Sequence, residues 1–364
     1  MASPIRRLIH SVGPVHLAGL TFPDWIRLLR ANHWKVDAPF LPRAVLVTLG
    51  SIMTSALKIV DDASFSDTCD ESLLQRPVFI LGLPRSGTTH LFQMIAASQA
   101  FGYPSRLDAF YPHVFRTLHR LGIPRLLSLI PAQKRMMDDV PTSWLSPEED
   151  SLALCVLAGQ GRRLVASFPS TRQLCDHDPA SSATALRTFS RRLVQVYRKP
   201  LLFKSPQHTG HVEEILTIFP EARFVTIFRN PLHQNNSQRQ AVTSDNKTWG
   251  ALQRGKPNAT SKSLQTNRLF LSAYFAQRTM IPTGHLMEIL YEDLILDAAA
   301  TLQRVYQFLG IADAPIPVPR EKHQQRPLSS MPLTGIDEFL DTYKDFYDRG
   351  IYERPTRESL ERQV

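Results

Sequence analysis

The sequence predicts an α/β protein in which helices cover both faces of a central parallel sheet. From about residue 75 onward, short apolar runs rich in Val, Ile and Phe alternate with segments of helical pattern, which is typical of a doubly wound sheet. The first of these runs leads through a glycine-bounded turn into a helix, as in phosphate-binding loops. We therefore expect a P-loop-type three-layer fold with a helical N-terminal extension and helical insertions.

The elements follow in order along the 364 residues. Residues 1–72 read as a helical extension packed on the core, 73–330 as the α/β domain and 331–364 as a helical tail. The expected strand and helix pairs are PVFILGL with THLFQMIAAS, PLLFKSP with GHVEEILTIFP, ARFVTIF with a helix after Pro231, and HLMEILYEDL with DAAATLQRVYQFLG. Asp297 is placed to cap the last of these helices and Gly310 to end it.

Two regions interrupt the alternation. Residues 110–192 are helical and rich in aromatic side chains, and residues 243–263 are polar and basic. The first is a candidate wall of an acceptor pocket and the second a candidate mobile cover, although ordinary insertions explain both equally well.

The least polar window is AVLVTLGSIMTSAL, residues 44–57. It carries no charge but falls short of the roughly 20 apolar residues that span a bilayer. We expect a buried or interfacial helix, and we favour core packing over the membrane surface.

Composition limits the partners. A net charge of +9 and a pI near 9.6 favour anionic partners, without choosing among nucleotide, nucleic acid and membrane headgroups. The cysteines, Cys69, Cys155 and Cys175, form neither a metal-ligand pattern nor an even-numbered disulfide set, which favours a reducing compartment. We predict no signal peptide and a cytoplasmic location, with peripheral membrane contact left open. The histidine-rich spots CDHD and HTGH lack three or four spaced ligands, so we expect no metal.

The glycine-bounded turn reads GLPRSGTT, residues 82–89. Its glycines permit a tight backbone path, and the amides that follow can converge on an anion at the helix N-terminus. A Walker loop carries a lysine where Thr88 stands, and a Walker-B aspartate would be expected where Arg229 closes a later strand. Both departures weaken a reading as a magnesium-nucleotide site and favour a shorter anion that protein cations neutralise.

Two further cations follow strands of the same sheet. Lys204 ends the strand of LLFKSPQH, and Arg229 ends that of ARFVTIFRNP. The carboxyl ends of parallel strands share one edge of a sheet, where such folds bind ligands. Ser237 lies eight residues after Arg229, two helical turns along if a helix begins at Pro231.

These motifs resemble the 3′-phosphoadenosine 5′-phosphosulfate (PAPS)-dependent sulfotransferases. PRSGTT is similar to their 5′-phosphosulfate loop in the arginine-bearing form of tyrosylprotein sulfotransferases and many bacterial members. FRNPLHQNNS resembles the 3′-phosphate motif, FKSP the lysine-bearing motif, and YEDL with TLQRVYQFLG the late strand and helix. SPEED, residues 146–150, is similar to a motif of large bacterial members. The likeness covers residues 75–100 and 200–310.

The resemblance implies transfer of a sulfuryl group from PAPS, without a metal, to a hydroxyl of a small-molecule or lipid acceptor. By this likeness Arg85 and the loop amides hold the 5′-phosphosulfate, Arg229 and Ser237 hold the 3′-phosphate, and Lys204 neutralises the departing oxygen. The implied donor-binding residues are Arg85, Ser86, Gly87, Thr88, Thr89, Arg229, Ser237 and Tyr291. Lys204, Arg85 and Asp108 are the implied catalytic residues.

The catalytic base has several candidates. Related enzymes often carry a glutamate some twenty residues after the loop, whereas YPSRLDAFYPH offers only Asp108. His208 and His113 are rivals, and the acidic cluster of residues 148–150 is more typical of a helix start.

Two other functions compete. A P-loop kinase is disfavoured by Thr88 and by the missing metal ligand, and a non-catalytic nucleotide- or membrane-binding protein of the same fold stays open. We expect no nucleic-acid partner. The sequence fixes neither the acceptor nor the oligomeric state.

Overall fold

A computed structural model describes residues 17–66, 68–134, 141–159, 164, 166–171, 179–243, 251–254, 260–317 and 336–356. The chain divides into two compact units and passes between them several times. Unit 1 comprises Met1–Leu74, Tyr103–Arg198 and Asp245–Pro257, and unit 2 comprises Gln75–Gly102, Lys199–Ser244 and Asn258–Val364. The boundaries expected at residues 72 and 330 stay predictions.

Unit 2 is built on a four-stranded sheet in the order β4-β1-β5-β6. All of its pairings are parallel, with Ile80 opposite Lys204 on one side and Val225 on the other. The strands are β1 (Val78–Leu81), β4 (Leu202–Lys204), β5 (Arg223–Phe228) and β6 (Leu286–Leu290). β1 is buried along its whole length, as a strand covered on both faces must be. The predicted α/β fold with a central parallel sheet is confirmed.

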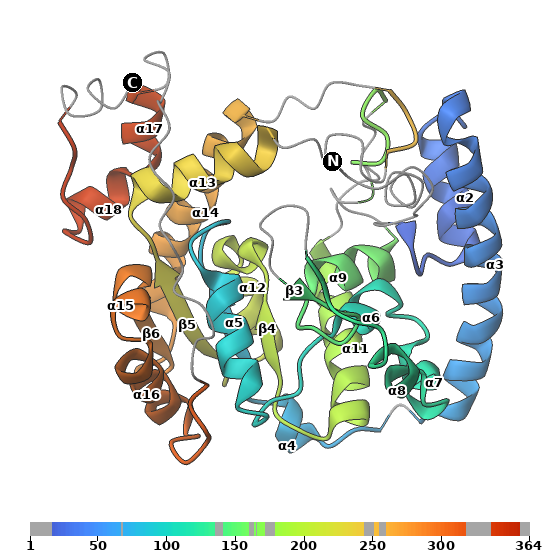
Figure 1. Ribbon diagram of the computed structural model, residues 1–364, viewed down its shortest axis with the longest axis horizontal. Helices are drawn as coiled ribbons and strands as arrows, with labels where there is room; N and C mark the ends of the chain where they lie inside the picture. Colours follow the sequence, from blue (N-terminus) through green and yellow to red (C-terminus); the bar gives the residue numbers. More distant parts are fainter. Residues whose placement is uncertain are drawn as a thin grey trace. The chain divides into compact units, whose positions relative to one another are not determined.

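Helices follow the strands as expected (Figure 1), with α5 in contact with β1 and β4, α15 in contact with β6, and α16 packed on α15. The helices are α5 (Thr88–Ala97), η3 (Pro206–Gly210), α12 (Val212–Ile218), α13 (Pro231–Thr243), α14 (Thr260–Gln277), η5 (Arg278–Met280), α15 (Tyr291–Leu296), α16 (Ala298–Leu309), α17 (Ile336–Thr342) and α18 (Lys344–Asp348). The Asp297 side chain accepts from the Ala300 amide, and Gly310 ends α16 in the left-handed conformation, so both predicted signals are confirmed.

Unit 1 is mainly helical in its described residues. Its helices are α2 (Phe22–Ala31), η2 (Ala38–Phe40), α3 (Leu41–Ser64), α4 (Glu71–Leu74), α6 (Arg106–Phe110), α7 (Phe115–Arg120), α8 (Ile123–Leu127), α9 (Ser151–Ala158) and α11 (Pro179–Tyr197). A two-stranded antiparallel ribbon joins β2 (Gln133–Lys134) to β3 (Pro141–Thr142). The acidic cluster does precede a helix, with Asp150 at the N-cap position of α9.

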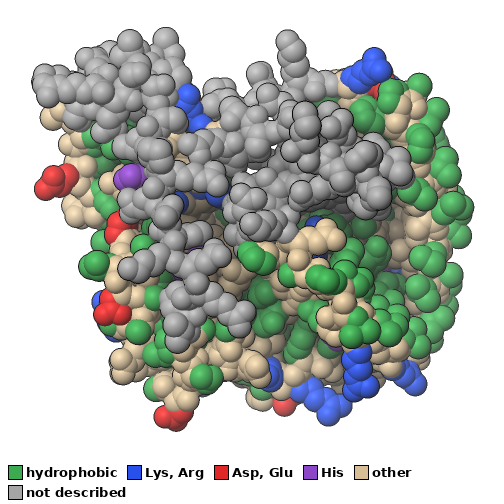
Figure 2. Space-filling view, viewed as in Figure 1, with side chains coloured by type: hydrophobic (Ala, Val, Ile, Leu, Met, Phe, Trp, Pro, Cys, Tyr) green, Lys and Arg blue, Asp and Glu red, His purple; other side chains and the backbone are tan. Residues whose placement is uncertain are grey.

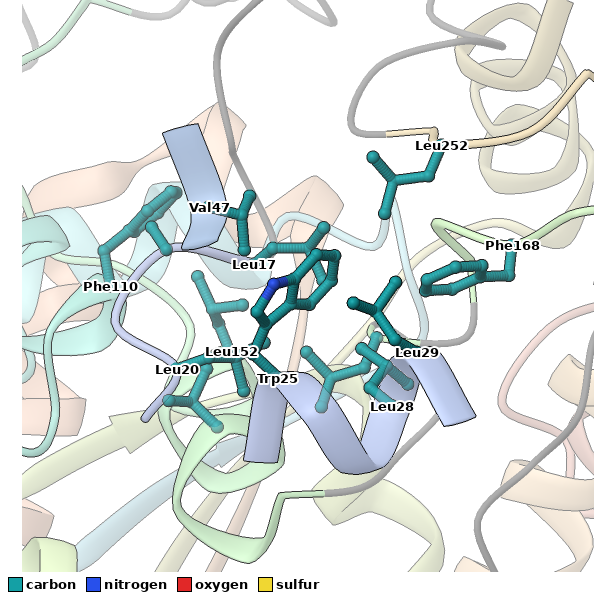
Figure 3. Close-up of a cluster of buried hydrophobic side chains, with 13 residues drawn as sticks. Leu17, Leu20, Trp25, Leu28, Leu29, Val47, Phe110, Leu152, Phe168 and Leu252 are labelled. Carbon is teal, nitrogen blue, oxygen red and sulfur yellow. The ribbon is translucent and has the colours of Figure 1, made fainter. Parts of the chain in front are cut away.

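The core of unit 1 surrounds Trp25, which is fully buried (Figure 3). Leu28 and Leu29 from the same helix pack with Phe168 and Leu252, which lie far away in sequence. Leu252 belongs to the basic segment read as a mobile cover, so its described part, residues 251–254, is anchored in a core. The rest of that segment lies outside the described residues, apart from the helix ends at 243 and 260–263.

Helix α3 contains the apolar window of residues 44–57, and the expectation of core burial is wrong. Its buried residues are Arg43, Val47, Ser51, Thr54 and Asp61. The outward residues are Leu41, Val45, Leu46, Leu49, Ile52, Met53, Ile59 and Val60, each between 44% and 72% exposed. The helix thus turns its more polar face inward and its apolar face outward.

Candidate functional site

The loop after β1 has a backbone path that only particular residues adopt easily. Gly82 has a φ of +149° and Gly87 one of +101°, both in the region that favours glycine. A Cβ on Gly82 would lie 2.7 Å from the Ile227 carbonyl oxygen, closer than real contacts allow. Arg85 has a φ of +70°, which is uncommon for a residue with a side chain and clusters at functional sites.

Thr209 fixes the start of the loop. Its hydroxyl accepts from the Gly82 amide at 2.9 Å and donates to the Gly82 carbonyl at 3.1 Å. The hydroxyl is buried, so both backbone groups of Gly82 are paired away from water. Thr209 lies in HTGH, which the sequence analysis weighed only as a metal motif, and no local pattern signals a contact across 127 residues.

Two side chains hold the outer carbonyls of the loop. Arg229 donates from Nη1 to the Arg85 carbonyl at 3.0 Å, and Gln234 donates from Nε2 to the Pro84 carbonyl. Gln234 in turn accepts from the hydroxyl of Tyr343, which is fully buried. The backbone at Pro84 and Arg85, where φ of Arg85 is positive, is therefore held by side chains that follow β5, lie on α13 and lie between α17 and α18.

The side chains of Arg85 and Ser237 meet. Arg85 Nε donates to the Ser237 hydroxyl at 3.1 Å, across 152 residues of sequence. Ser237 is on α13, which begins at Pro231 as predicted. The loop arginine and the serine of the third motif, which the resemblance assigns to opposite ends of the donor, thus lie side by side.

Tyr291 packs on the second glycine of the loop. A Cβ on Gly87 would lie 2.3 Å from its ring, so the ring covers the glycine directly. The Arg229 guanidinium stacks on the Tyr291 ring, 4.5 Å from the centroid. Burial lowers the pKa of Arg229 and raises the pKa of Tyr291.

Lys204 reaches the helix that follows the loop. It is 2% exposed, and its ammonium donates to the Thr89 hydroxyl at 3.1 Å. Ser86 is equally buried, and its hydroxyl has no hydrogen-bond partner within the described part of the chain. An unpaired buried hydroxyl on such a loop suits an anion that would accept from it.

The structure therefore gathers most of the predicted donor residues around one loop. Arg85, Arg229 and Lys204 supply three cations, and the loop amides precede helix α5. The described residues contain no group of three or more His, Cys, Asp or Glu side chains arranged to hold a metal. The arrangement can bind an anion and stabilise negative charge that develops on it.

Asp108 lies in unit 1 and is completely buried. It forms a capping box with Ser105 at the start of α6. Its carboxylate also accepts from the Tyr197 hydroxyl at 2.6 Å and lies 2.8 Å from His119 Nε2. Burial, followed by the charge of Asp108, raises the pKa of Tyr197 well above its usual value. No sequence pattern singled out His119 or Tyr197.

The two histidines that compete with Asp108 as the catalytic base lie in different units. His208, in unit 2, is 6% exposed and lies edge-on to the Phe79 ring at 5.1 Å. His113, in unit 1, is 5% exposed, and burial lowers its pKa to about 4, so it is neutral at pH 7. The choice among Asp108, His208 and His113 stays a prediction.

An α/β fold whose glycine-bounded loop is surrounded by cations is typical of proteins that bind anionic groups. Residues 77–315 match the model of the Sulfotransferase family, which is more than half of the chain. The chain therefore belongs to the sulfotransferase family and is an enzyme of that class. The predicted family is confirmed.

Two curated relatives match nearly the whole chain. Both are named omega-hydroxy-beta-dihydromenaquinone-9 sulfotransferase Stf3, one from Mycobacterium bovis and one from Mycobacterium tuberculosis. Each is 27% identical over 358 residues, covering 93% of this chain and 92% of the relative.

Solved structures share the fold. Sulfotransferase STF9 from Mycobacterium avium is 16% identical, with a TM-score of 0.56 over 93% of this chain and 98% of that one. Sulfotransferase STF1 from Mycobacterium tuberculosis is 17% identical, with a TM-score of 0.50 over 94% and 91% of the two chains. At these identities the likeness concerns the fold alone.

Proposed function

We propose that this sulfotransferase moves a sulfuryl group from PAPS to a hydroxyl on a lipid-like acceptor. The observation that supports this proposal is a set of contacts around the loop between β1 and α5. Arg85 donates to Ser237, Arg229 donates to the Arg85 carbonyl, and Lys204 donates to Thr89 at the start of α5. Three cations and a hydroxyl around one glycine-bounded loop suit the anionic phosphosulfate of this donor. The acceptor class is supported by the relatives, whose name specifies a hydroxylated menaquinone derivative.

In the proposed reaction the acceptor oxygen attacks sulfur, and the bond from sulfur to the bridging phosphate oxygen breaks. The sulfuryl group moves to the acceptor, and 3′-phosphoadenosine 5′-phosphate leaves with the bonding electrons. Lys204 stabilises charge on the departing oxygen, while Arg85 and the loop amides hold the phosphate. The acceptor proton passes to a base, for which we propose Asp108.

The direct test is a transfer assay with labelled PAPS on purified variants. We expect Lys204→Ala to lower turnover roughly 10²–10³-fold, as removal of one well-placed donor of charge stabilisation does, and Arg85→Ala to abolish transfer. Lys199→Ala is the matched control, because Lys199 precedes β4 at its other end and donates to the Gln99 carbonyl. Full activity in either site variant would refute the mechanism, as would preferential binding of ATP with magnesium over 3′-phosphoadenosine 5′-phosphate.

The base has a separate test. We expect Asp108→Asn to lower turnover while donor affinity stays intact, with thermal unfolding as a control because the carboxylate also caps α6. A loss of turnover seen only in His208→Ala would transfer the role of the base to that histidine.

The acceptor has a test of its own, which is mass spectrometry of the products formed from a lipid extract of the host. Sulfation of water-soluble phenols alone would refute the lipid-like class of acceptor.

A further inference from the structure

The outward face of α3 is an apolar stripe on the surface of unit 1. Its exposed side chains recur at the helical period from Leu41 through Val45, Leu49 and Met53 to Val60. At 1.5 Å per residue the stripe is about 28 Å long. No charged residue lies between Arg43, which is buried, and Lys58. Solvated helices normally carry charges on this face.

The opposite face of α3 is held to unit 1 by polar anchors along its length. Arg43 donates to the Ala251 carbonyl near one end. Trp25 donates from its indole to the Thr48 hydroxyl at 2.9 Å in the middle. Near the other end the Asp61 carboxylate accepts from Arg116 at 2.6 Å and from the Thr117 amide at 2.8 Å. These bonds explain why the polar side chains turn inward, and they fix which face stays outside.

The apolar surface continues beyond α3. Helix α7 contacts α3, and the segment that follows exposes Leu121, Leu126, Leu129 and Ile130 by 46% to 78%. We call these residues and the outward residues of α3 the apolar face. Figure 2 shows hydrophobic side chains gathered at the right-hand side of the view, where α3 lies, with Lys and Arg side chains at the lower edge.

The segment beside α3 is basic. Residues 109–137 contain five Lys and Arg residues and no Asp or Glu, and of these Arg116 is buried against Asp61 of α3, where Asp62 is 42% exposed. Arg120 and Arg125 are exposed beside the apolar side chains of this segment. A surface that joins apolar side chains to cations complements a layer in which anionic headgroups overlie hydrocarbon.

We propose that the apolar face docks this enzyme on an anionic lipid bilayer, with α3 lying in the plane of the interface. The outward side chains enter the boundary between headgroups and acyl chains, and Arg120 and Arg125 pair with lipid phosphates. Docking on the bilayer does not involve the sulfate-transfer reaction, so it does not depend on which acceptor the enzyme sulfates.

Helix α3 does not cross the bilayer in this proposal. Residues Ala38–Ser64 are long and apolar enough to span a membrane by length and composition, and 22% of the apolar 18-residue window within them is buried. Spanning would remove Asp61 and Arg43 from their partners and carry both charges into hydrocarbon, at a cost of several kcal/mol. A second copy of the chain is also a poorer occupant, because a two-fold contact would bring like charges together.

The test is flotation of the purified full-length enzyme with vesicles of phosphatidylcholine alone or with 30% phosphatidylglycerol added. We expect flotation with the anionic vesicles and weaker flotation as salt rises. The variant Leu49→Gln/Ile52→Gln/Met53→Gln should partition roughly tenfold to hundredfold less well, since each change removes an outward apolar side chain. The variant Arg120→Gln/Arg125→Gln should lose most of the preference for anionic vesicles.

The matched control is Leu269→Gln/Met280→Gln/Leu296→Gln, which replaces three side chains of unit 2 that are 48% to 89% exposed. It should float like the unchanged enzyme. Circular dichroism and thermal unfolding show that each variant is folded, which is expected because the changed side chains face outward.

Three results would overturn the proposal. The first is failure of the unchanged enzyme to float, and the second is equal flotation of the α3 variant and the control. The third is a dimer in light scattering that the α3 variant dissociates, which would assign the apolar face to a second copy. None of these readouts involves sulfate transfer, so the proposed function can fail while docking stands, and the reverse.

Discussion

A methyl group added to the second glycine of the loop tests whether the Tyr291 ring holds that loop in shape. In Gly87→Ala the new Cβ would lie 2.3 Å from the ring, on a residue with a φ of +101°. The left-handed backbone costs about 1–2 kcal/mol for a residue with a side chain. Overpacking adds typically about 1–3 kcal/mol, so we expect a loss of about 2–5 kcal/mol in unfolding free energy.

The two contributions separate in a double-mutant cycle. In a Tyr291→Ala background the ring is gone, so Gly87→Ala should cost only the backbone part, about 1–2 kcal/mol. Urea unfolding of the four proteins measures the coupling, and calorimetry with 3′-phosphoadenosine 5′-phosphate should show weaker binding in the single glycine variant. Equal costs in both backgrounds, within the roughly 0.5 kcal/mol additivity error, would refute the contact as the cause.

Three further predictions concern other buried groups. Asp61→Ala removes the nearer of two carboxylates from the buried Arg116 and unpairs the Thr117 amide, and it should lower the free energy of unfolding by about 3–5 kcal/mol. Asp62→Ala, at a side chain 42% exposed, should cost under about 1 kcal/mol. Burial lowers the pKa of His113 to about 4, so the unfolded chain binds more protons between pH 4 and 6.5. Urea titrations should therefore find unfolding free energy about 2 kcal/mol lower at pH 5 than at pH 7, and His113→Gln should flatten that dependence. Thr209→Val should weaken binding of 3′-phosphoadenosine 5′-phosphate and cost about 1–3 kcal/mol, because it unpairs the first loop glycine, and Thr209→Ser should restore both in calorimetry and melting.

The sheet and the loop were predictable because their signals are local. Apolar runs of strand length, the glycines on either side of Arg85 and the cap at Asp297 each lie within a few residues of what they specify. Parallel pairing then places Lys204 and Arg229 at the same edge, although the strands carrying them are not neighbours in the sheet. The fold class and the cluster of cations could therefore be predicted from the apolar pattern of the sequence and the parallel order of the strands.

The expected core burial of residues 44–57 was wrong because the partners that hold α3 are distant in sequence. Nothing near Asp61 shows that Arg116 will meet it 55 residues later. Asp108 could be singled out as the nearest acid after the loop, but its contacts with His119 and Tyr197 depend on how α6, α7 and α11 pack. Hydropathy scales rank side chains by the free energy of their transfer out of water. A hydrogen bond formed inside the protein offsets that cost, so a polar side chain that the scale places at the surface can be buried.

The hydrogen bond from Tyr343 to Gln234 makes the loop between β1 and α5 depend on a residue far along the sequence. Proteins are synthesised from the N-terminus, so the loop leaves the ribosome about 260 residues before its support, by the separation of Pro84 from Tyr343. A nascent or prematurely ended chain can pair β1 with β4 and still lack the contact that steadies the strained arginine. We therefore expect the loop to reach its final shape only after residue 343 has been synthesised.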